Sequence, residues 1–235
     1  MLLWEKKAFV EGASLIIGVD EAGRGPLAGP VVAGAVSLTR MPLKRFNPPR
    51  FRERIDDSKK IVPGQRKKSS VEILKKTVFG IGRRGQGFID RENIHRATAL
   101  AMKDAVRSLV KKFCQRNNKK EKDIRSRVCV LVDGNIDPGF PYRTVKIIKG
   151  DSKSLSIAAA SIIAKVSRDK IMLSYDKRFP EYGFSKHKGY GTRLHIEAIK
   201  RYGPCELHRK TFAPILWQSQ RGRGTAPIKN DLCKN

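Results

Sequence analysis

The sequence lacks any long apolar segment. None of its 235 residues belongs to an apolar run near the ~20 residues that a membrane-spanning helix requires, which excludes a membrane protein built from such helices. The first residues become charged at Glu5, before an apolar core of signal-peptide length develops. We therefore expect a cytoplasmic protein with no membrane partner.

Cysteine is scarce and widely spaced. The chain has no Cys-x-x-Cys pair and no Cys/His cluster with the spacing of zinc ligands. We expect reduced thiols in a reducing compartment and no zinc site. The four cysteines are Cys114, Cys129, Cys205 and Cys233.

Acidic residues are less than half as numerous as basic ones. The chain has 22 Asp and Glu against 50 Lys and Arg, which gives a formal net charge of +28. Such an excess attracts polyanions, because contacts to phosphates release bound counterions. Nucleic acid is the leading expected partner, although composition alone does not separate an enzyme from a ribosome-associated or membrane-surface protein.

Apolar, β-branched runs and amphipathic segments together predict an α/β fold with a mixed central sheet flanked by helices. Apolar residues recur at helical spacing over 91–115. An Ala- and Ile-rich helix follows Asp151, with Ser154 or Ser156 as its N-cap, and a further helix is expected over 192–201. The expected strands are 14–20, 29–38, 77–84, 128–133 and 144–150.

We expect these elements to form a single domain over residues 14–214 with a helical C-terminal region. Residues 40–68 interrupt it with a segment rich in Pro, Arg and Lys, which predicts a basic loop or insertion. After Trp217 no apolar periodicity remains, which predicts a disordered basic tail over 218–235.

In so basic a chain, the acidic residues at strand ends are informative. Asp20 and Glu21 end the first expected strand, Asp133 ends the fourth, and Asp151 ends the fifth. If these ends meet in one sheet, the four carboxylates share a pocket and raise each other's pKa unless a cation lies between them. An all-oxygen site without His or Cys favours Mg²⁺ or Mn²⁺ over Zn²⁺.

Such a carboxylate cluster under a positive surface predicts phosphodiester hydrolysis by two metal ions. Strand-end Asp residues are also common turn and cap formers, and that alternative is strong for any one of them but weak for all four together. Adjacent strand residues point to opposite faces, so Asp20 and Glu21 cannot both enter the pocket from regular β-structure. We therefore expect a turn to begin at these two residues.

Two glycine-rich loops are candidates for substrate contact. In the first, N–H groups around Gly23 and Gly25, with Arg24 between them, could hold a phosphate or a sugar hydroxyl. In the second, Tyr190 lies between glycines beside several cations and could stack on a base or a sugar. The alternative for Tyr190 is a ring that packs its loop onto the protein.

The histidines carry no catalytic pattern. His187, in the second glycine-rich loop, could transfer protons, although a lone loop histidine is more often structural or exposed. The others have no partner pattern: His95, His195 and His208.

Several longer motifs match one known family in their order along the chain. They are GVDEAGRGPLAGPVVAGAV (18–36), DDSKK (56–60), NIHRATALAM (93–102), VLVDGN (130–135), KGDSKSLSIAAASIIAKVSRD (149–169), PEYGFSKHKGYGT (180–192) and RYGPCELHR (201–209). Through them the sequence resembles bacterial ribonuclease HII. The resemblance implies a ribonuclease H-like fold and a monomer that requires no small-molecule cofactor.

The resemblance also implies an activity. The expected substrates are RNA/DNA hybrids and duplex DNA containing single ribonucleotides, cut on the 5′ side of the ribonucleotide to leave a 3′-hydroxyl and a 5′-phosphate. The family's metal-binding carboxylates correspond to Asp20, Glu21, Asp133 and Asp151. Asp169 matches a position that we treat as an accessory acid near the second metal, with an ordinary helix-surface Asp as the equal alternative.

The substrate-binding residues of the family can be assigned in the same way. The resemblance places the reading of the ribose 2′-hydroxyl on Gly23, Arg24 and Gly25, and the sensing of the RNA–DNA junction on Tyr190. Two alternatives remain. One is ribonuclease HIII, which usually carries an additional N-terminal domain, and the other is a non-catalytic nucleic-acid-binding protein. The intact carboxylates argue against the second, because acids in a polyanion-binding groove weaken binding unless metals use them.

Overall fold

The computed structural model describes residues 1–39 and 46–216. These residues divide into two compact units, one of Met1–Arg24 with Pro30–Ile171, the other of Gly25–Gly29 with the described residues from Met172 onward. Residues 40–45 of the expected basic segment and the expected tail over 218–235 lie outside the described residues.

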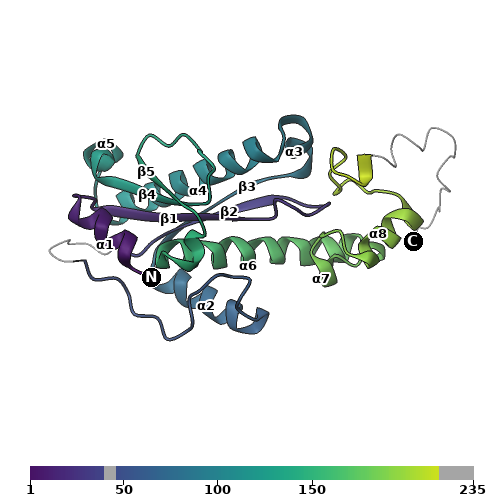
Figure 1. The fold of residues 1–235 in the computed structure, drawn as a ribbon, viewed down its shortest axis with the longest axis horizontal. Coiled ribbons are helices and arrows are strands. Elements are labelled where there is room, and N and C mark those ends of the chain that lie inside the picture. Colours follow the sequence, from purple (N-terminus) through teal and green to yellow (C-terminus); the bar gives the residue numbers. More distant parts are fainter. Residues whose placement is uncertain (40–45, 217–235) are drawn as a thin grey trace. The chain divides into compact units, whose positions relative to one another are not determined.

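A mixed sheet of five strands forms the centre of the first unit (Figure 1). Its order is β3-β2-β1-β4-β5, with β1 antiparallel to β2, β2 antiparallel to β3, and β1, β4 and β5 parallel. The parallel strands end at the same edge of the sheet, and the predicted mixed α/β architecture is confirmed. The strands are β1 (Leu15–Ala22), β2 (Val31–Ser37), β3 (Val78–Arg84), β4 (Val128–Asp133) and β5 (Arg143–Ile147).

Helices α4 (Ile94–Arg116) and α6 (Leu155–Arg178) cover opposite faces of this sheet (Figure 1). Helix α6 lies directly on the strands, because a Cβ atom at Gly18 would fall 2.1 Å from the backbone of Ser156. Side chains on the same face of β1 as Gly18 therefore point toward α6. The smaller elements of this unit are α1 (Leu3–Val10), α2 (Pro63–Lys76), α3 (Gln86–Glu92), α5 (Glu121–Ile124) and short 3-10 turns at Arg125–Arg127 and Gly150–Ser152.

The start of α6 is held by a buried carboxylate from α1. Ser154 is the N-cap, since its hydroxyl accepts a hydrogen bond from the Ile157 N–H at 3.3 Å. Oε1 of Glu5 accepts from the Ser154 hydroxyl at 2.6 Å, the Ser156 N–H at 2.9 Å and the Ser156 hydroxyl at 2.8 Å. A carboxylate in this position is stabilised by the positive end of the helix dipole.

Replacing Glu5 by Ala should therefore lower the free energy of unfolding by about 2–3 kcal/mol, the value of hydrogen bonds to a charged group. Urea denaturation followed by circular dichroism measures it. Leu3→Ala is the matched control on the same helix, since Leu3 is 73% exposed. Equal stabilities for the two variants would contradict the capping role of Glu5.

Helix α2 begins inside residues 40–68, the segment expected to be a basic loop or insertion, so it is the expectation of a loop that the structure contradicts. That prediction is wrong from Pro63 onward, where proline occupies the first turn of the helix. The buried side of α2 is mostly polar and consists of Arg66, Ser69, Ser70 and Ile73. A buried face of this composition produces no apolar periodicity, because its side chains are satisfied by hydrogen bonds instead. Arg66, for example, donates to the Ser58 carbonyl at 2.8 Å and to the Ile61 carbonyl at 2.6 Å.

The helix expected over 91–115 is interrupted near its start. Asn93 separates α3 from α4 with a φ of 71°, and its side chain accepts from the Arg96 N–H as the N-cap of α4. The helix expected over 192–201 is confirmed as α8 (Arg193–Tyr202), which begins after the N-cap Thr192.

The second unit is helical, as expected for the C-terminal region. It contains the last turns of α6, a 3-10 turn at Pro180–Tyr182, α7 (Phe184–His187) and α8. Its core includes Leu27, Met172, Phe184 and Leu207. The fully buried Arg209 donates to the Gly29 carbonyl through Nε at 3.0 Å and through its terminal nitrogen at 2.9 Å, which ties residues 25–29 to this unit.

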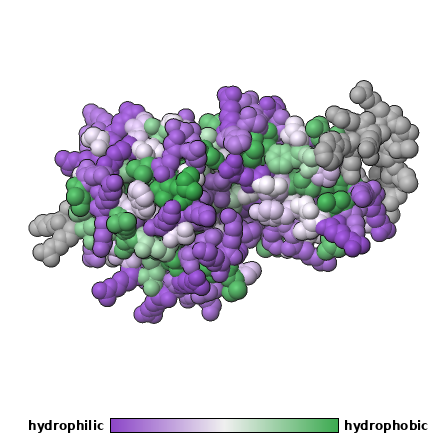
Figure 2. Space-filling model, viewed as in Figure 1, coloured by the Kyte–Doolittle hydropathy of each residue, from purple (hydrophilic) through white to green (hydrophobic). Residues whose placement is uncertain are grey.

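The surface agrees with the composition. Hydrophilic side chains predominate on the face shown in Figure 2, and apolar side chains form only separate small patches there. Within residues 1–39 and 46–216, no helix has the length and apolar character needed to cross a membrane.

Candidate functional site

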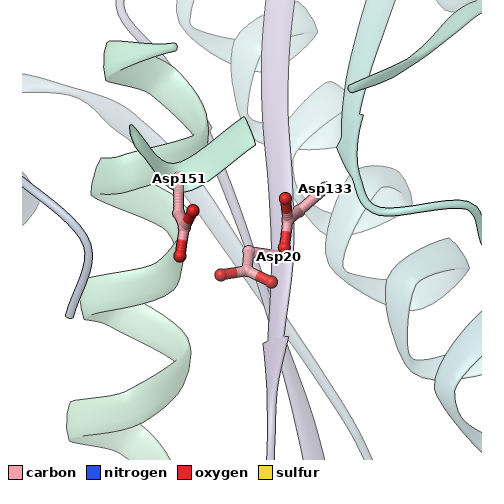
Figure 3. Close-up of side chains that lie close together, drawn as sticks. All are labelled: Asp20, Asp133 and Asp151. Carbon is pink, nitrogen blue, oxygen red and sulfur yellow. The ribbon is translucent and has the colours of Figure 1, made fainter. Parts of the chain in front are cut away.

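Three aspartates from three segments meet at the ends of the parallel strands (Figure 3). Val19 of β1 pairs with Val132 of β4, so the next residues, Asp20 and Asp133, lie side by side on the same face of the sheet. Asp151 approaches from the 3-10 turn Gly150–Ser152. Ligand oxygens of the three carboxylates lie within 4.8 Å of one another.

The turn that carries Asp151 is fixed to the end of β4. Strand β5 ends at Ile147, so Asp151 does not end a strand as expected but follows it on the turn. The Gly150 N–H donates to Oδ1 of Asp133 at 2.6 Å. A Cβ atom at Gly150 would lie 2.7 Å from Cδ1 of Ile157 and 3.2 Å from Oδ1 of Asp133, so a side chain here would crowd the Asp133 carboxylate.

The carboxylates destabilise one another's charged forms. Asp20 is only 6% exposed. Its pKa is raised well above the ordinary value, first by burial and then by the charges of Glu21 and Asp133. The pKa of Asp151 is raised by burial, by Asp133 and by Asp57, against the opposing effect of Lys59.

This donor set fits a divalent cation. The three aspartates offer only oxygen ligands, and their mutual repulsion disappears when a cation lies between them. Oxygen ligands without nitrogen or sulfur suit Mg²⁺ or Mn²⁺. The buried cluster therefore has the chemistry of a divalent-metal site.

Glu21 lies beside this group but does not belong to the set of oxygens within 4.8 Å. Strand β1 continues to Ala22, so the expected turn at Asp20 and Glu21 is absent, and the pleat directs these two side chains to opposite faces. Arg24 lies 3.4 Å from Oε1 of Glu21. Burial raises the pKa of Glu21, Arg24 lowers it, and the charge of Asp133 raises it further.

Comparison with known proteins identifies the family. The family model described as Ribonuclease HII matches residues 17–219. The chain belongs to the ribonuclease HII family. It is 46% identical to Ribonuclease HII from Caldanaerobacter subterraneus over 214 residues, covering 90% of this chain and 79% of the relative. It is also 46% identical to Ribonuclease HII from Chlamydia pneumoniae over 218 residues, covering 92% and 91%.

Solved structures of related enzymes have the same fold. Ribonuclease H2 from Pyrococcus horikoshii superposes with a TM-score of 0.67 at 25% identity, over 90% of this chain and 100% of that one. The structure of Bst-RNase HIII in complex with Mn²⁺ shares the fold, with a TM-score of 0.66 at 18% identity over 92% of this chain and 73% of the other. As a member of the ribonuclease HII family, the chain is a divalent-metal-dependent ribonuclease H endonuclease that acts on nucleic acid.

Gly23, Arg24 and Gly25 follow β1 directly. Gly23 has a φ of 98°, and a Cβ atom there would lie 2.0 Å from Nε of Arg168. Arg168 is fully buried and donates to the Pro30 carbonyl at 3.0 Å, so its side chain cannot move aside. Gly25, in contrast, has open space around its Cα and an ordinary φ.

The cations near the carboxylates were not predicted from the sequence. A pocket of about 420 Å³ is lined by Asp57, Lys59, Lys60, Asp133, Lys149, Asp151 and Ser152. The first three of these belong to DDSKK (56–60), one of the motifs behind the resemblance, for which the sequence suggested no separate role. Two lysines after two acids in one short motif were the only signal in the sequence, and they do not show that the motif lies beside Asp133 and Asp151.

Asp169 is not brought to the triad. It pairs with Lys165 at 2.8 Å, one turn earlier on α6, and lies 3.7 Å from Arg66 of α2. Tyr190 belongs to the second unit and is 43% exposed. An exposed ring is compatible with stacking on a substrate, which the sequence left open beside the alternative of a ring that packs its loop onto the protein.

Proposed function

We propose that the chain hydrolyses the RNA strand of RNA/DNA hybrids and cuts duplex DNA on the 5′ side of single ribonucleotides. The products are a 3′-hydroxyl and a 5′-phosphate. The cluster of Asp20, Asp133 and Asp151 is the observation that carries this proposal, because oxygen-only metal sites beside cations suit phosphodiester hydrolysis. Ribonucleotide excision repair is the cellular role that follows from this specificity.

Asp20, Asp133 and Asp151 would hold the metal ions, and Glu21, whose charge acts on Asp20, would join them by turning its longer side chain around the strand. Two divalent ions bound there supply an activated water and charge stabilisation at the leaving oxygen. The Gly150 N–H keeps the Asp133 carboxylate oriented. Lys59 and Lys149, which line the same pocket, neutralise the charge of the substrate phosphate.

The chain's own loops would select the ribonucleotide. Only the 2′-hydroxyl separates RNA from DNA at one nucleotide, so a selective site must contact that group. Backbone groups of Gly23 and Gly25 contact the hydroxyl, Arg24 holds the adjacent phosphate, and Tyr190 stacks on the neighbouring sugar. Removing these contacts should lower the preference for ribonucleotide-containing duplex more than the affinity for all-DNA duplex.

A second groove extends the binding surface for the nucleic-acid backbone. It encloses about 540 Å³ and is lined by Arg24, His95, Arg96, Ala99, Asn135, Ile136 and Asp137. Arg24 and Arg96 are the charged donors that would contact phosphates along it.

The test is cleavage of an end-labelled DNA duplex containing one ribonucleotide, with Mg²⁺, with Mn²⁺ or with EDTA, beside an all-DNA duplex. A metal-dependent cut on the 5′ side of the ribonucleotide, absent from the all-DNA duplex, is expected. A cut on the 3′ side or a 2′,3′-cyclic phosphate product contradicts the proposed chemistry. Binding without a cut, here and on a long RNA/DNA hybrid, overturns the proposal.

A further inference from the structure

The second unit contains a buried cluster of three histidines that the proposed chemistry does not use. Nε2 of His195 lies 3.1 Å from Nε2 of His208. The ring of His187 stacks on that of His195, with centroids 4.3 Å apart and planes inclined by 19°. The expectation that His195 and His208 have no partner pattern is wrong, because the fold brings together residues that are 13 positions apart.

Backbone partners determine which nitrogens carry protons in this pair. Nδ1 of His208 lies 3.0 Å from the Cys205 nitrogen and 3.3 Å from the Cys205 carbonyl oxygen. We assign the shorter contact as a hydrogen bond from the Cys205 N–H, which leaves Nδ1 unprotonated and the proton on Nε2. Nδ1 of His195 lies 2.9 Å from the Tyr190 carbonyl, which can only accept, so this Nδ1 carries a proton. The contact between the rings is therefore a hydrogen bond from Nε2–H of His208 to the bare Nε2 of His195.

His187 is determined in the same way. Its Nδ1 accepts from the Gly189 N–H at 3.2 Å, and its Nε2 donates to the Tyr182 carbonyl at 2.8 Å. All three imidazoles are neutral, and each makes a directed bond to the backbone. In the assigned arrangement, a second proton on any ring would point at an N–H group, which belongs to Gly189 for His187, to His208 for His195 and to Cys205 for His208.

Burial and the charged groups around the three histidines favour the neutral form of the rings. Burial lowers the pKa of both His195 and His208 to about 4. The pKa of His187 is lowered by burial, with Asp176 opposing and Lys188 and Lys186 reinforcing the effect. The Cys205 thiol, 3.2 Å from Nδ1 of His208, is protonated because burial raises its pKa to about 11, with Glu181 and Glu206 adding to the rise.

The chain of hydrogen bonds ends on the main chain of Tyr190. The Tyr190 carbonyl accepts from His195 and, at 2.8 Å, from the Thr192 N–H. The Tyr190 N–H donates to the His187 carbonyl at 3.0 Å. The main chain of this residue is thus held on both sides while its ring stays 43% exposed.

We propose that His208 and His195 are positioning residues, which hold the Tyr190 main chain through the relay Cys205 N–H to His208 to His195 to Tyr190 carbonyl. This inference rests on the proposed role of Tyr190 in substrate selection. A ring on an exposed loop loses conformational freedom when it stacks, and a main chain fixed in advance reduces that cost. The histidines act on selection without touching the substrate.

Two substitutions at one position separate the two bonds of His195. In His195→Asn the side-chain amide takes the place of Nδ1 and can still donate to the Tyr190 carbonyl. In His195→Gln the polar atoms take the place of Nε2, which keeps the contact to His208 and removes the bond to Tyr190. We expect His195→Gln to lower kcat/KM on a single-ribonucleotide duplex by about fivefold to tenfold, the effect of one hydrogen bond, with unchanged affinity for all-DNA duplex. His195→Asn keeps the bond to the Tyr190 carbonyl and loses the contact to His208, so its kcat/KM should fall by only about twofold to threefold, between the parent and His195→Gln.

A double-mutant cycle tests whether the effect passes through Tyr190. In the Tyr190→Ala background, His195→Gln should cause no further loss, because the group that it positions is gone. An equal further loss in that background, or equal activity of the Gln and Asn variants, overturns the proposal. If Tyr190→Ala alone leaves selection unchanged, the proposed role of Tyr190 fails instead.

A measurement on the unaltered protein decides the relay independently of activity and of variant folding. In ¹⁵N spectra of the full chain at neutral pH, His195 should be protonated at Nδ1, and His208 and His187 at Nε2. A proton on Nε2 of His195 or on Nδ1 of His208 contradicts the relay, whatever the role of Tyr190.

Discussion

Replacing Asp20 by Asn should lower kcat by about 10³-fold or more while leaving affinity for a ribonucleotide-containing duplex largely intact. Asp20 lies between Asp133 and Asp151 in the cluster (Figure 3), so its charge contributes to every cation that the cluster binds. Metal activation of phosphodiester hydrolysis is worth several kcal/mol, and each 1.36 kcal/mol is a factor of ten in rate. Single-turnover cleavage beside equilibrium binding measures the two quantities separately.

Stability distinguishes loss of chemistry from loss of folding. The raised pKa of Asp20 shows that its charged form is disfavoured in the folded protein, so Asn should not lower the metal-free melting temperature. The rise in melting temperature on adding Mn²⁺ should shrink, because one ligand is missing. Asp104→Asn on α4 is the matched control and should cleave normally, since Asp104 is paired with Arg84 rather than with the cluster. Wild-type turnover by Asp20→Asn would remove the proposed site.

Replacing Gly23 by Ala should lower kcat/KM by about 100-fold and the free energy of unfolding by about 2 kcal/mol or more. The added methyl group would meet the buried Arg168 side chain at 2.0 Å and the Pro30 carbonyl at 2.7 Å, in a backbone conformation that disfavours side chains. The loop must shift, and a displacement of about 1 Å at a positioning element costs about this much activity.

Gly25→Ala is the control for this substitution. No atom lies within 4 Å of the methyl group that it adds, so the protein itself should keep its stability. A loss of selection in Gly25→Ala without a loss of stability then reports contact between the loop and the substrate. Equal free energies of unfolding for the two variants would contradict the steric conflict that we expect between a side chain at position 23 and the buried Arg168. Urea denaturation and cleavage of the single-ribonucleotide duplex provide the measurements.

Much of the fold was predictable because its signals are local. Apolar β-branched runs identified all five strands, and the N-cap of α6 was one of the two serines expected. Helix α2 was not predicted because its buried face is mostly polar. The side chains there, Arg66 and two serines, give no apolar periodicity in the sequence. The break between α3 and α4 at Asn93 was not predicted, because a single residue with positive φ does not change the spacing of apolar residues.

The candidate site was predictable only as a list of residue types. Three of its four carboxylates come together as expected, but the continuation of β1 to Ala22 keeps Glu21 outside the closest group. The sequence could not show that the lysines of DDSKK lie beside the carboxylates, or that Arg168 packs against Gly23. Each depends on a contact between segments far apart in the chain.

The sequence by itself determined the class of protein and the chemistry open to it. Net charge, strand-end acids and ordered motifs are properties of the chain, and they suffice for a basic nuclease that uses divalent metals. Only the tertiary structure decided which carboxylates face one another and that Gly23 must remain glycine. It also decided that the His195 and His208 rings form a hydrogen bond with each other. Those outcomes depend on strand register, helix approach and burial, because a side chain's partners across space are set by packing and not by its neighbours in sequence.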